Sequence, residues 1–285
     1  MSAQITLLPG NRLHLNHGPI DLVISADGAA REIERAYAQA AALFPSILPE
    51  LVAELPLLRT PIGDAKPAPS GVVARCMVNA VWPHRDVFIT PMAAVAGAVA
   101  EHVLAAMMEV ADLRRAIVNN GGDIALHLAS GERMRAGIVG DLSMPYLDAT
   151  IEIGSADPVR GMATSGWRGR SQSLGIADAV TVLARNAAMA DAAATMIANA
   201  VNIEDEAIHR RPACKLRDDS DLGAIPVTVD VGPLSAAKVR QALENGARRA
   251  TELKDKDLIV VAYLQLQGQV LVVGGTERTA AGKAA

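Results

Sequence analysis

The chain has 285 residues, of which 51% are hydrophobic, and a formal net charge of −4 at pH 7. This hydrophobic content is enough for one large domain or two small ones with a substantial core, and the acidic balance provides no basic surface for nucleic acid. Aromatic residues make up only 2% of the chain, which argues against the stacking platforms that hold single-stranded bases.

The sequence carries no membrane or export signal that we recognise. Residues Met1–Asn11 lack a basic start and a long apolar core, and no run reaches about 20 uninterrupted apolar residues. The two cysteines, Cys76 and Cys214, fit no zinc spacing and are typical of buried thiols in a reducing compartment. We therefore expect a cytoplasmic protein without a membrane span.

The first part of the chain predicts short strands followed by helices. Prolines at 45, 49 and 56 are expected to divide the stretch after an alanine-rich helix into short pieces, because proline lacks the N–H that a helix interior needs. Pro91 opens a long helix, and the face that carries Gly97, Ala98 and Glu101 suits close packing of another helix or a ligand. The predicted elements are strands at 4–8, 12–15 and 20–25, helices at 29–43 and 72–81, a strand at 86–90 and a helix at 91–108.

The stretch Val118–Ile124 predicts a strand, a tight turn and a second strand. Gly121 and Gly122 let the backbone adopt positive φ angles and let a ligand approach closely. Asp123 then places a carboxylate at the mouth of a turn that has free N–H groups. This combination suits a phosphate, a metal or a nucleotide hydroxyl, although an ordinary turn with an Asn-Gly signal explains it equally well.

The rest of the chain alternates hairpin signals with long helices. Ser130-Gly131 predicts a hairpin between strands at 124–129 and 134–139, and Gln267-Gly268 predicts another between 258–264 and 269–273. Antiparallel sheets covered on one face by helices, an α+β fold, follow from this alternation. The other predicted elements are strands near 149–153, 159–164 and 177–184, helices at 186–201 and 235–253, the second capped by Ser235, an irregular segment at 203–223 and a frayed tail at 276–285.

Asp191 and Thr195 are candidate metal ligands. They lie four residues apart on the predicted helix at 186–201, which puts both oxygens on one helix face. Mg²⁺ prefers oxygen ligands and retains several waters, so one carboxylate, one hydroxyl and a backbone carbonyl would supply part of its shell. The alternative is a pair that faces solvent or another helix.

The glycine- and serine-rich segment 164–175 is a predicted loop. Its guanidinium and hydroxyl groups could hold a phosphate, or the segment could be an ordinary solvated loop. The sequence around Ser171 and Ser173 also comes near the G-x-S-x-G pattern of serine hydrolases without fitting it. The candidate phosphate contacts are Arg168, Arg170, Ser171 and Ser173.

Four stretches between Thr90 and Val201 occur in an order that resembles the ApbE-type superfamily, whose best-known members are FAD:protein FMN transferases. One such motif is weak, whereas four in order at sensible spacing are specific. The sequences Pro91–Gly97 and Asn120–Ile124 are similar to those of an uncharacterised branch of the superfamily. The stretches are Ala94–Glu101 for the family's I-A-K-G-x-x-x-D helix, Val118–Ile124 for its V-N-x-G-G-D-I turn, Thr164–Gly166 for its T-S-G and Ala190–Thr195 for its A-D-A-x-x-T.

This resemblance implies a T-fold-like architecture with duplicated antiparallel sheets backed by helices, as a single domain of two packed halves over residues 1–285. It also implies that Asp191 and Thr195 bind Mg²⁺ and that FAD or FMN is the cofactor or ligand. Asp123, Ser171 and Ser173 are the candidate catalytic residues. The implied ligand contacts are Asn120, Gly121, Gly122, Asp123, Thr164, Ser165, Gly166, Arg168 and Arg170.

The chain departs from the flavin transferases at two places. Residues 166–180 contain neither the histidine nor the proline of the family's His-x-x-x-Pro-x-x-Gly segment, and Ala96 and Glu101 replace a lysine and an aspartate. We therefore expect a Mg²⁺-dependent enzyme that acts on a flavin nucleotide or another phosphorylated or heterocyclic ligand. The alternatives are a binding protein without catalysis and a cofactor-independent hydrolase that uses Ser171 or Ser173. Long alanine-rich helices in a hydrophobic chain further suggest a homodimer.

Overall fold

The computed structural model describes residues 2–138, 149–169 and 171–275, which form two compact units. Unit 1 contains the chain up to Arg133 together with Gly154–Ala163 and Ala184–Ala192. Unit 2 contains Met134–Ile153, Thr164–Leu183 and the chain from Ala193 onward. The predicted frayed tail at 276–285 lies outside the described residues.

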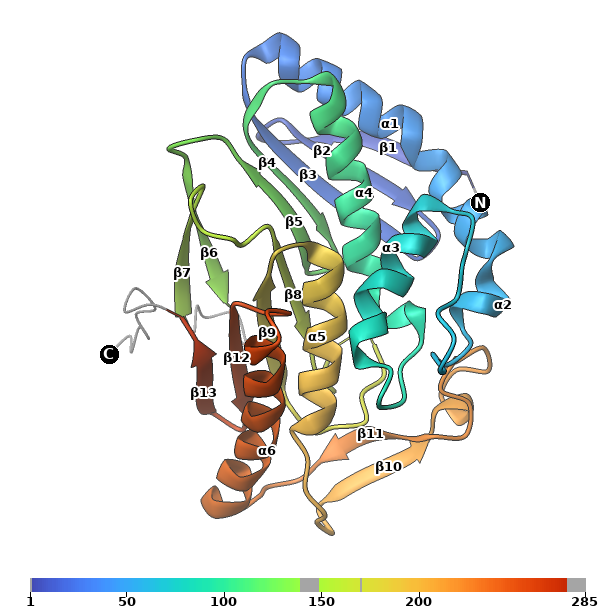
Figure 1. Ribbon diagram of the computed structural model, residues 1–285, viewed down its shortest axis with the longest axis vertical. Coiled ribbons are helices and arrows are strands. Elements are labelled where there is room, and N and C mark those ends of the chain that lie inside the picture. Colours follow the sequence, from blue (N-terminus) through green and yellow to red (C-terminus); the bar gives the residue numbers. More distant parts are fainter. Residues whose placement is uncertain (1, 139–148, 170, 276–285) are drawn as a thin grey trace. The chain divides into compact units, whose positions relative to one another are not determined.

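The elements alternate short strands with helices (Figure 1). The helices are α1 (Ala30–Ala53), α2 (Leu55–Leu58), α3 (Val72–Val81), α4 (Val95–Val110), α5 (Ala187–Ala200) and α6 (Ala236–Asp255), with short 3-10 turns η1 (Trp82–His84), η2 (Pro91–Ala94) and η3 (Ala213–Lys215). The strands are β1 (Gln4–Leu8), β2 (Arg12–His17), β3 (Ile20–Gly28), β4 (Leu113–Asn120), β5 (Asp123–Leu128), β6 (Arg133–Ile138), β7 (Ala149–Gly154), β8 (Gly161–Ser165), β9 (Ala179–Ala184), β10 (Ile208–Pro212), β11 (Pro226–Val231), β12 (Val261–Leu266) and β13 (Gln269–Gly274).

Unit 1 contains an antiparallel sheet in which β1, β2, β3, β4 and β5 follow one another and the start of β8 pairs with β5. Alternate residues are buried along β2, the first half of β3 and the second half of β4, and in β2 these are Leu13, Leu15 and His17. Helices α1 and α4 pack against this sheet (Figure 1). The alternation of buried and more exposed residues along these strands therefore determines which face of the sheet the helices cover.

Unit 2 contains the antiparallel neighbours β9, β12 and β13, with α6 packed against β12 and β13. Every residue of β9 and β12 is buried. Gly246 of α6 lies so close to its neighbours that a Cβ there would be 2.3 Å from Val201 Cγ2. Two further ribbons pair β6 with β7 and β10 with β11.

These observations confirm the predicted α+β class, with antiparallel sheets backed by helices in each unit. The helix at 72–81, the helix capped by Ser235 and the last hairpin form as predicted, and the Ser235 hydroxyl accepts from the N–H of Lys238. That the two units form one domain of packed halves stays a prediction.

Helix α1 is longer than the sequence predicts, because it continues through Pro45 and Pro49 to Ala53. Each proline removes one helical N–H. The apolar side chains of Phe44, Ile47 and Leu51 are nevertheless buried on one side of α1 beyond the expected end. Burial of these apolar side chains offsets the missing hydrogen bonds, so tertiary packing overrides the helix-breaking tendency of the two prolines.

Three strand predictions were wrong. Residues 86–90 form no strand, and the hairpin expected around Ser130-Gly131 does not form, since β5 pairs with β4 and β8 while β6 pairs with β7. The segment expected to be irregular at 203–223 contains β10, which pairs antiparallel with β11. Strands β5 and β10 pair with strands that a local pattern does not identify, and residues 86–90 have no pairing partner strand.

One apolar segment in the described part of the chain, Pro91–Val110, is long enough to cross a membrane by length and composition. Within unit 1 it includes α4, which contacts α1, α3, β4 and β5. The side chains of Ala98, Val103 and Met107 are buried there. Core packing therefore accounts for its apolar composition.

The start of α5 touches α4 without any side chain between the two backbones. A Cβ on Gly97 would lie 2.3 Å from the carbonyl oxygen of Ala187, far inside the contact distance. The face of small residues predicted on this helix thus packs against another helix. Gly161 is under a similar constraint, since a Cβ there would lie 2.2 Å from the Asn186 carbonyl.

We predict that Gly97→Ala destabilises the protein by about 1–3 kcal/mol or more, because the added methyl group must push two helix backbones apart. Urea unfolding measures the change. Gly63→Ala is the matched control, since a Cβ on Gly63 meets nothing within 4 Å and should change stability little. Equal stability of the two variants would contradict the close contact.

Candidate functional site

Two carboxylates in unit 1 cap each other's helices across the contact between α4 and α5. Asp191 of α5 accepts from the Gly97 N–H at 3.0 Å and also from the Ala96 N–H. Glu101 of α4 accepts from the Ala188 N–H at 3.4 Å. First-turn N–H groups have no partner within their own helix, so each acid satisfies donors of the opposite helix.

The glycine turn between β4 and β5 is fixed to the start of α4. The side-chain nitrogen of Asn120 donates to the Ala96 carbonyl at 3.1 Å, and its side-chain oxygen Oδ1 accepts from the Asp21 N–H at 3.4 Å. Gly121 and Gly122 have φ angles of 64° and 116°, which favour glycine. The turn therefore has a defined place beside the first turn of α4, as Asn120 is itself buried.

Asp123 follows this turn and lies close enough to Asp191 for the two charges to interact. Burial raises the pKa of Asp191 well above its ordinary value, the negative charge of Asp123 raises it further, and the N–H groups of Gly97 and Ala96 oppose the shift. One oxygen of Asp123 has no solvent access, and Asp191 is only partly exposed. Like charges this close disfavour ionisation of both carboxylates at once, so Asp191 holds its proton more strongly than an ordinary aspartate.

Glu101 is also set in a low-polarity environment. Burial raises its pKa, while the N–H groups of Ala188 and Ala187 and the thiol of Cys76 lower it. Burial and the nearby Glu101 raise the pKa of Cys76 to about 12, so this thiol is neutral and inert at physiological pH. Glu101 thereby links α3, α4 and α5.

The other predicted ligand contacts belong to unit 2. The hydroxyls of Thr164 and Thr181 lie 2.8 Å apart, and a Cβ on Gly166 would lie 2.4 Å from the Asp178 carbonyl oxygen. Arg168 donates from Nε to Asp178 at 2.8 Å, and its guanidinium lies 5.0 Å from the ring centre of Trp167. The charge of Arg168 is thus already paired.

Ser173 has a structural environment rather than that of a nucleophile. Its side chain is 3% exposed, its hydroxyl donates to the Asn199 amide oxygen at 3.3 Å, and it accepts from the Gly175 N–H at 3.2 Å. An activated serine needs a basic partner, and an amide oxygen is not a base. Ser171 is exposed on the same loop.

The predicted site residues therefore fall into two groups. The structure brings the glycine turn, Asp123 and Asp191 together in unit 1. Ser165, Thr195 and the loop residues are in unit 2, and Arg170 lies outside the described residues. Thr195 lies one turn after Asp191 on the same helix.

The available donors fit a hard cation. Within the described residues, no three histidine, cysteine, aspartate or glutamate side chains gather as a ready-made metal cluster. The donors near Asp191 are carboxylate oxygens, with the Thr195 hydroxyl one helical turn away. An all-oxygen set with few protein ligands suits Mg²⁺, which keeps several waters, rather than Zn²⁺.

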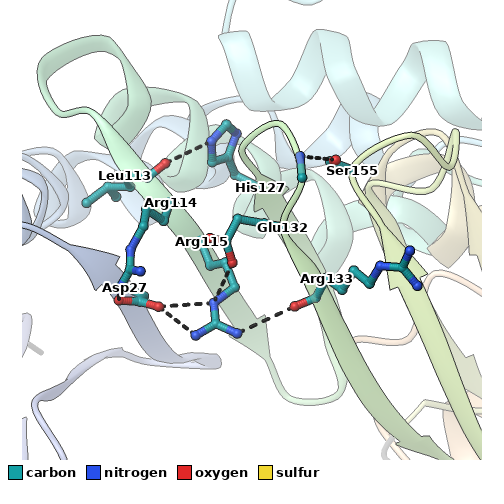
Figure 2. Close-up of polar contacts among 9 residues, drawn as sticks. Asp27, Leu113, Arg114, Arg115, His127, Glu132, Arg133 and Ser155 are labelled. Carbon is teal, nitrogen blue, oxygen red and sulfur yellow. Dashed lines mark hydrogen bonds and ion pairs between the residues drawn. The ribbon is translucent and has the colours of Figure 1, made fainter.

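A second polar cluster in unit 1 is an ion-pair network that sequence reasoning did not identify (Figure 2). Asp27 accepts from Arg114 at 2.6 Å and from Arg115 Nη2 at 2.5 Å, and Arg115 also lies 3.6 Å from Glu132. These arginines hold the pKa of Asp27 below its ordinary value. A surface hollow of about 630 Å³ lies beside Arg114 and the start of α1, and its lining charges of both signs favour no ligand class.

Asp191→Asn is predicted to stabilise the metal-free protein at neutral pH. The isosteric amide keeps an acceptor for the Gly97 N–H and removes the charge that burial and Asp123 oppose. The melting temperature should rise by about 2–4 °C for each kcal/mol of relieved repulsion. Because the folded-state pKa of Asp191 is raised, the wild type loses stability as the pH rises through that pKa, and the two proteins should converge as the pH falls toward about 4.

Thermal unfolding in the presence of a chelator, from pH 4 to pH 8, tests this expectation. Asp230→Asn changes an exposed aspartate and serves as the control. A lower melting temperature for Asp191→Asn at pH 8 would contradict the coupling of Asp191 with Asp123.

Comparison with known proteins agrees with the sequence motifs. A model of the family described as AbpE bacteria matches residues 5–272. A UPF0280 protein from Methanopyrus kandleri is 37% identical over 204 residues, which cover 70% of this chain and 78% of that protein. A UPF0280 protein from Methanothrix thermoacetophila is 44% identical over 114 residues, but the match spans only 46% of that relative.

Among solved structures, the apo form of the flavinyl transferase ApbE from Pseudomonas stutzeri aligns over 96% of this chain and 95% of its own, with 13% identity and a TM-score of 0.44. The family match covers almost the whole chain. The chain therefore belongs to the ApbE-like family described as AbpE bacteria.

Proposed function

We propose that this protein is a Mg²⁺-dependent enzyme that binds and acts on a small phosphorylated heterocyclic ligand, with a flavin nucleotide as the first candidate. The observation that carries the proposal is the pair of carboxylates, Asp123 and Asp191, beside the glycine turn and the start of α4. Their mutual repulsion is unfavourable unless a cation or a proton offsets it.

In this proposal Asp191 and Thr195 hold the metal, and Asp123 faces it from the glycine turn. Bound Mg²⁺ would supply positive charge for phosphate oxygens. The chain's own part is to orient these oxygens. The Asn120 amide fixes the turn to Ala96, the two glycines leave the backbone open to a ligand, and the N–H groups of α4 hold Asp191 in place.

The second set of proposed ligand contacts is Thr164, Ser165 and Gly166, which match the family's T-S-G. We also assign Arg168 and Arg170 to the phosphate end. For Arg168 this requires that its ion pair with Asp178 opens, or that both groups act together. Salt should then weaken ligand binding more than metal binding.

Transfer of FMN to a protein hydroxyl is the less favoured reaction. Position 96 has no amine here, and Ala96 serves through its backbone, with its carbonyl bound to Asn120 and its N–H directed at Asp191. The family's histidine and proline segment is missing as well. We therefore infer a different reaction on a related ligand, with a ligand-binding role as the alternative.

The hydrolase alternative receives little support from the geometry. Ser173 is buried and hydrogen-bonded to Asn199 rather than to a base, and Ser171 lies exposed on the loop. Activity that persists in a chelator and disappears in Ser171→Ala would favour the hydrolase over the metal-dependent enzyme.

Calorimetry tests the proposal, with Mg²⁺ alone and then FAD, FMN and ADP titrated with and without Mg²⁺. We expect nucleotide binding to require Mg²⁺ and to weaken at least tenfold in Asp191→Asn and Thr195→Val. Glu109→Gln, an exposed acid on α4, is the control and should bind like the wild type. Failure of all three nucleotides to bind the wild type in the presence of Mg²⁺ would rule out the nucleotide version.

Conversion of a bound nucleotide, followed by chromatography and mass spectrometry, then separates an enzyme from a binding protein. A ligand that binds tightly and is recovered unchanged would favour the binding protein.

We also propose that the protein forms a two-fold dimer in the cytoplasm. In unit 1, β1 is an edge strand on which Ile5 and Leu7 are 49% and 63% exposed, and an edge with apolar side chains is suited to pairing. Light scattering at micromolar concentration should give twice the mass of the chain, and Leu7→Lys should shift it toward one chain. A wild-type monomer would contradict this proposal.

A further inference from the structure

We infer that Glu101 is a positioning residue for the proposed metal site, acting through the first turn of α5 without touching the metal. This inference rests on the proposed role of Asp191. Glu101 and Asp191 come from opposite helices, and each accepts from N–H groups in the first turn of the other helix, beside the Gly97–Ala187 contact.

Side-chain acceptors hold the beginning of α5. The carboxylate of Glu101 accepts from the Ala188 N–H at 3.4 Å and from the Ala187 N–H, and the side-chain oxygen of Asn186 accepts from Met189 at 2.8 Å. The first three N–H groups of α5 therefore all have side-chain partners. Two of these three depend on Glu101.

The backbones of α4 and α5 meet directly at Gly97 and Ala187. The Ala187 carbonyl oxygen lies 2.3 Å from the position that a Cβ of Gly97 would take, so no side chain separates the two helix backbones there. A helix held at one such point can still rotate about it. The bonds of Glu101 to α5 and of Asp191 to α4 oppose that rotation, because they add two further attachments between the helices.

The orientation of α5 determines where Asp191 lies. Asp191 is one turn beyond Ala187, and its carboxylate lies 3.0 Å from the Gly97 nitrogen while it interacts with Asp123. A turn of α5 about the Gly97–Ala187 contact would change the spacing of the two carboxylates. Metal affinity falls steeply when ligands are misplaced, and residues behind the ligands commonly alter it 10–100-fold.

The side chain of Glu101 must supply an acceptor for this role, and the negative charge is secondary. Glutamine at this position keeps the acceptor oxygen and the length of the chain, whereas alanine removes both. Glu101→Gln should thus rescue what Glu101→Ala loses. A role based only on charge would make the two variants alike.

The experiment measures Mg²⁺ affinity by calorimetry and amide hydrogen exchange by mass spectrometry in the full chain. We expect Glu101→Ala to bind Mg²⁺ at least tenfold more weakly and to exchange faster at Ala187–Asp191, with its circular dichroism unchanged. Glu101→Gln should stay within about threefold of the wild type in affinity. Ser235→Ala, which loses the N-cap of α6 in unit 2, is the control for general destabilisation and should leave Mg²⁺ affinity unchanged.

Wild-type affinity in Glu101→Ala would overturn the inference, and so would an equal loss in Ser235→Ala. If the wild type binds no Mg²⁺, or Asp191→Asn binds it equally well, the proposed function fails. The positioning role is then decided by exchange alone: faster exchange confined to Ala187–Asp191 supports it, and unchanged exchange overturns it.

Discussion

The contact on which unit 1 depends is the direct meeting of two helix backbones at Gly97 and Ala187. Such an approach is possible because α4 has no side chain at that position. It brings the first turns of α4 and α5 close enough for side chains of one helix to reach the N–H groups of the other. Glu101 and Asp191 do so in opposite directions, and each lies one turn beyond the contact residue of its own helix. This one packing constraint therefore determines how the first turns of both helices are capped and where Glu101 and Asp191 lie.

Two features of the surroundings of Asp191 have opposite effects on the free energy of its charged form. As a cap it satisfies N–H groups of Gly97 and Ala96, and the dipole of α4 favours its charge. As a neighbour of Asp123 in a poorly solvated place it is destabilised in its charged form. A structural role alone would be served as well by an uncharged acceptor. The presence of a second carboxylate beside it is the feature that favours a cation, and therefore a site, over a simple helix cap.

Membership of the ApbE-like family fits this geometry, and the departures from the transferase pattern have a visible structural counterpart. The backbone of Ala96 bonds to Asn120 and Asp191, so the position keeps its place in the fold while its side chain carries no chemistry. Arg168, a cation proposed to take the place of the missing lysine, is paired with Asp178 and lies over the ring of Trp167. The residues of the proposed metal site thus match the family's motifs better than the segments that would handle a flavin.

The sequence by itself determined the features that depend on neighbours along the chain. These include the strand alternation, the glycine turn, the Ser235 cap and the small-residue face of α4. The expectation of free N–H groups at the glycine turn was wrong for Gly122, whose N–H donates to the side-chain oxygen of Asn119 at 2.8 Å. Only the tertiary structure decided which distant groups meet. Helix α1 runs through two prolines because its stripe is buried, β6 pairs with β7 rather than β5, and Asp191 meets an N–H that is 94 residues away. Each residue type fixes which hydrogen bonds a side chain can make. Long-range packing decides which partner it meets, and a local sequence pattern gives no information about that packing.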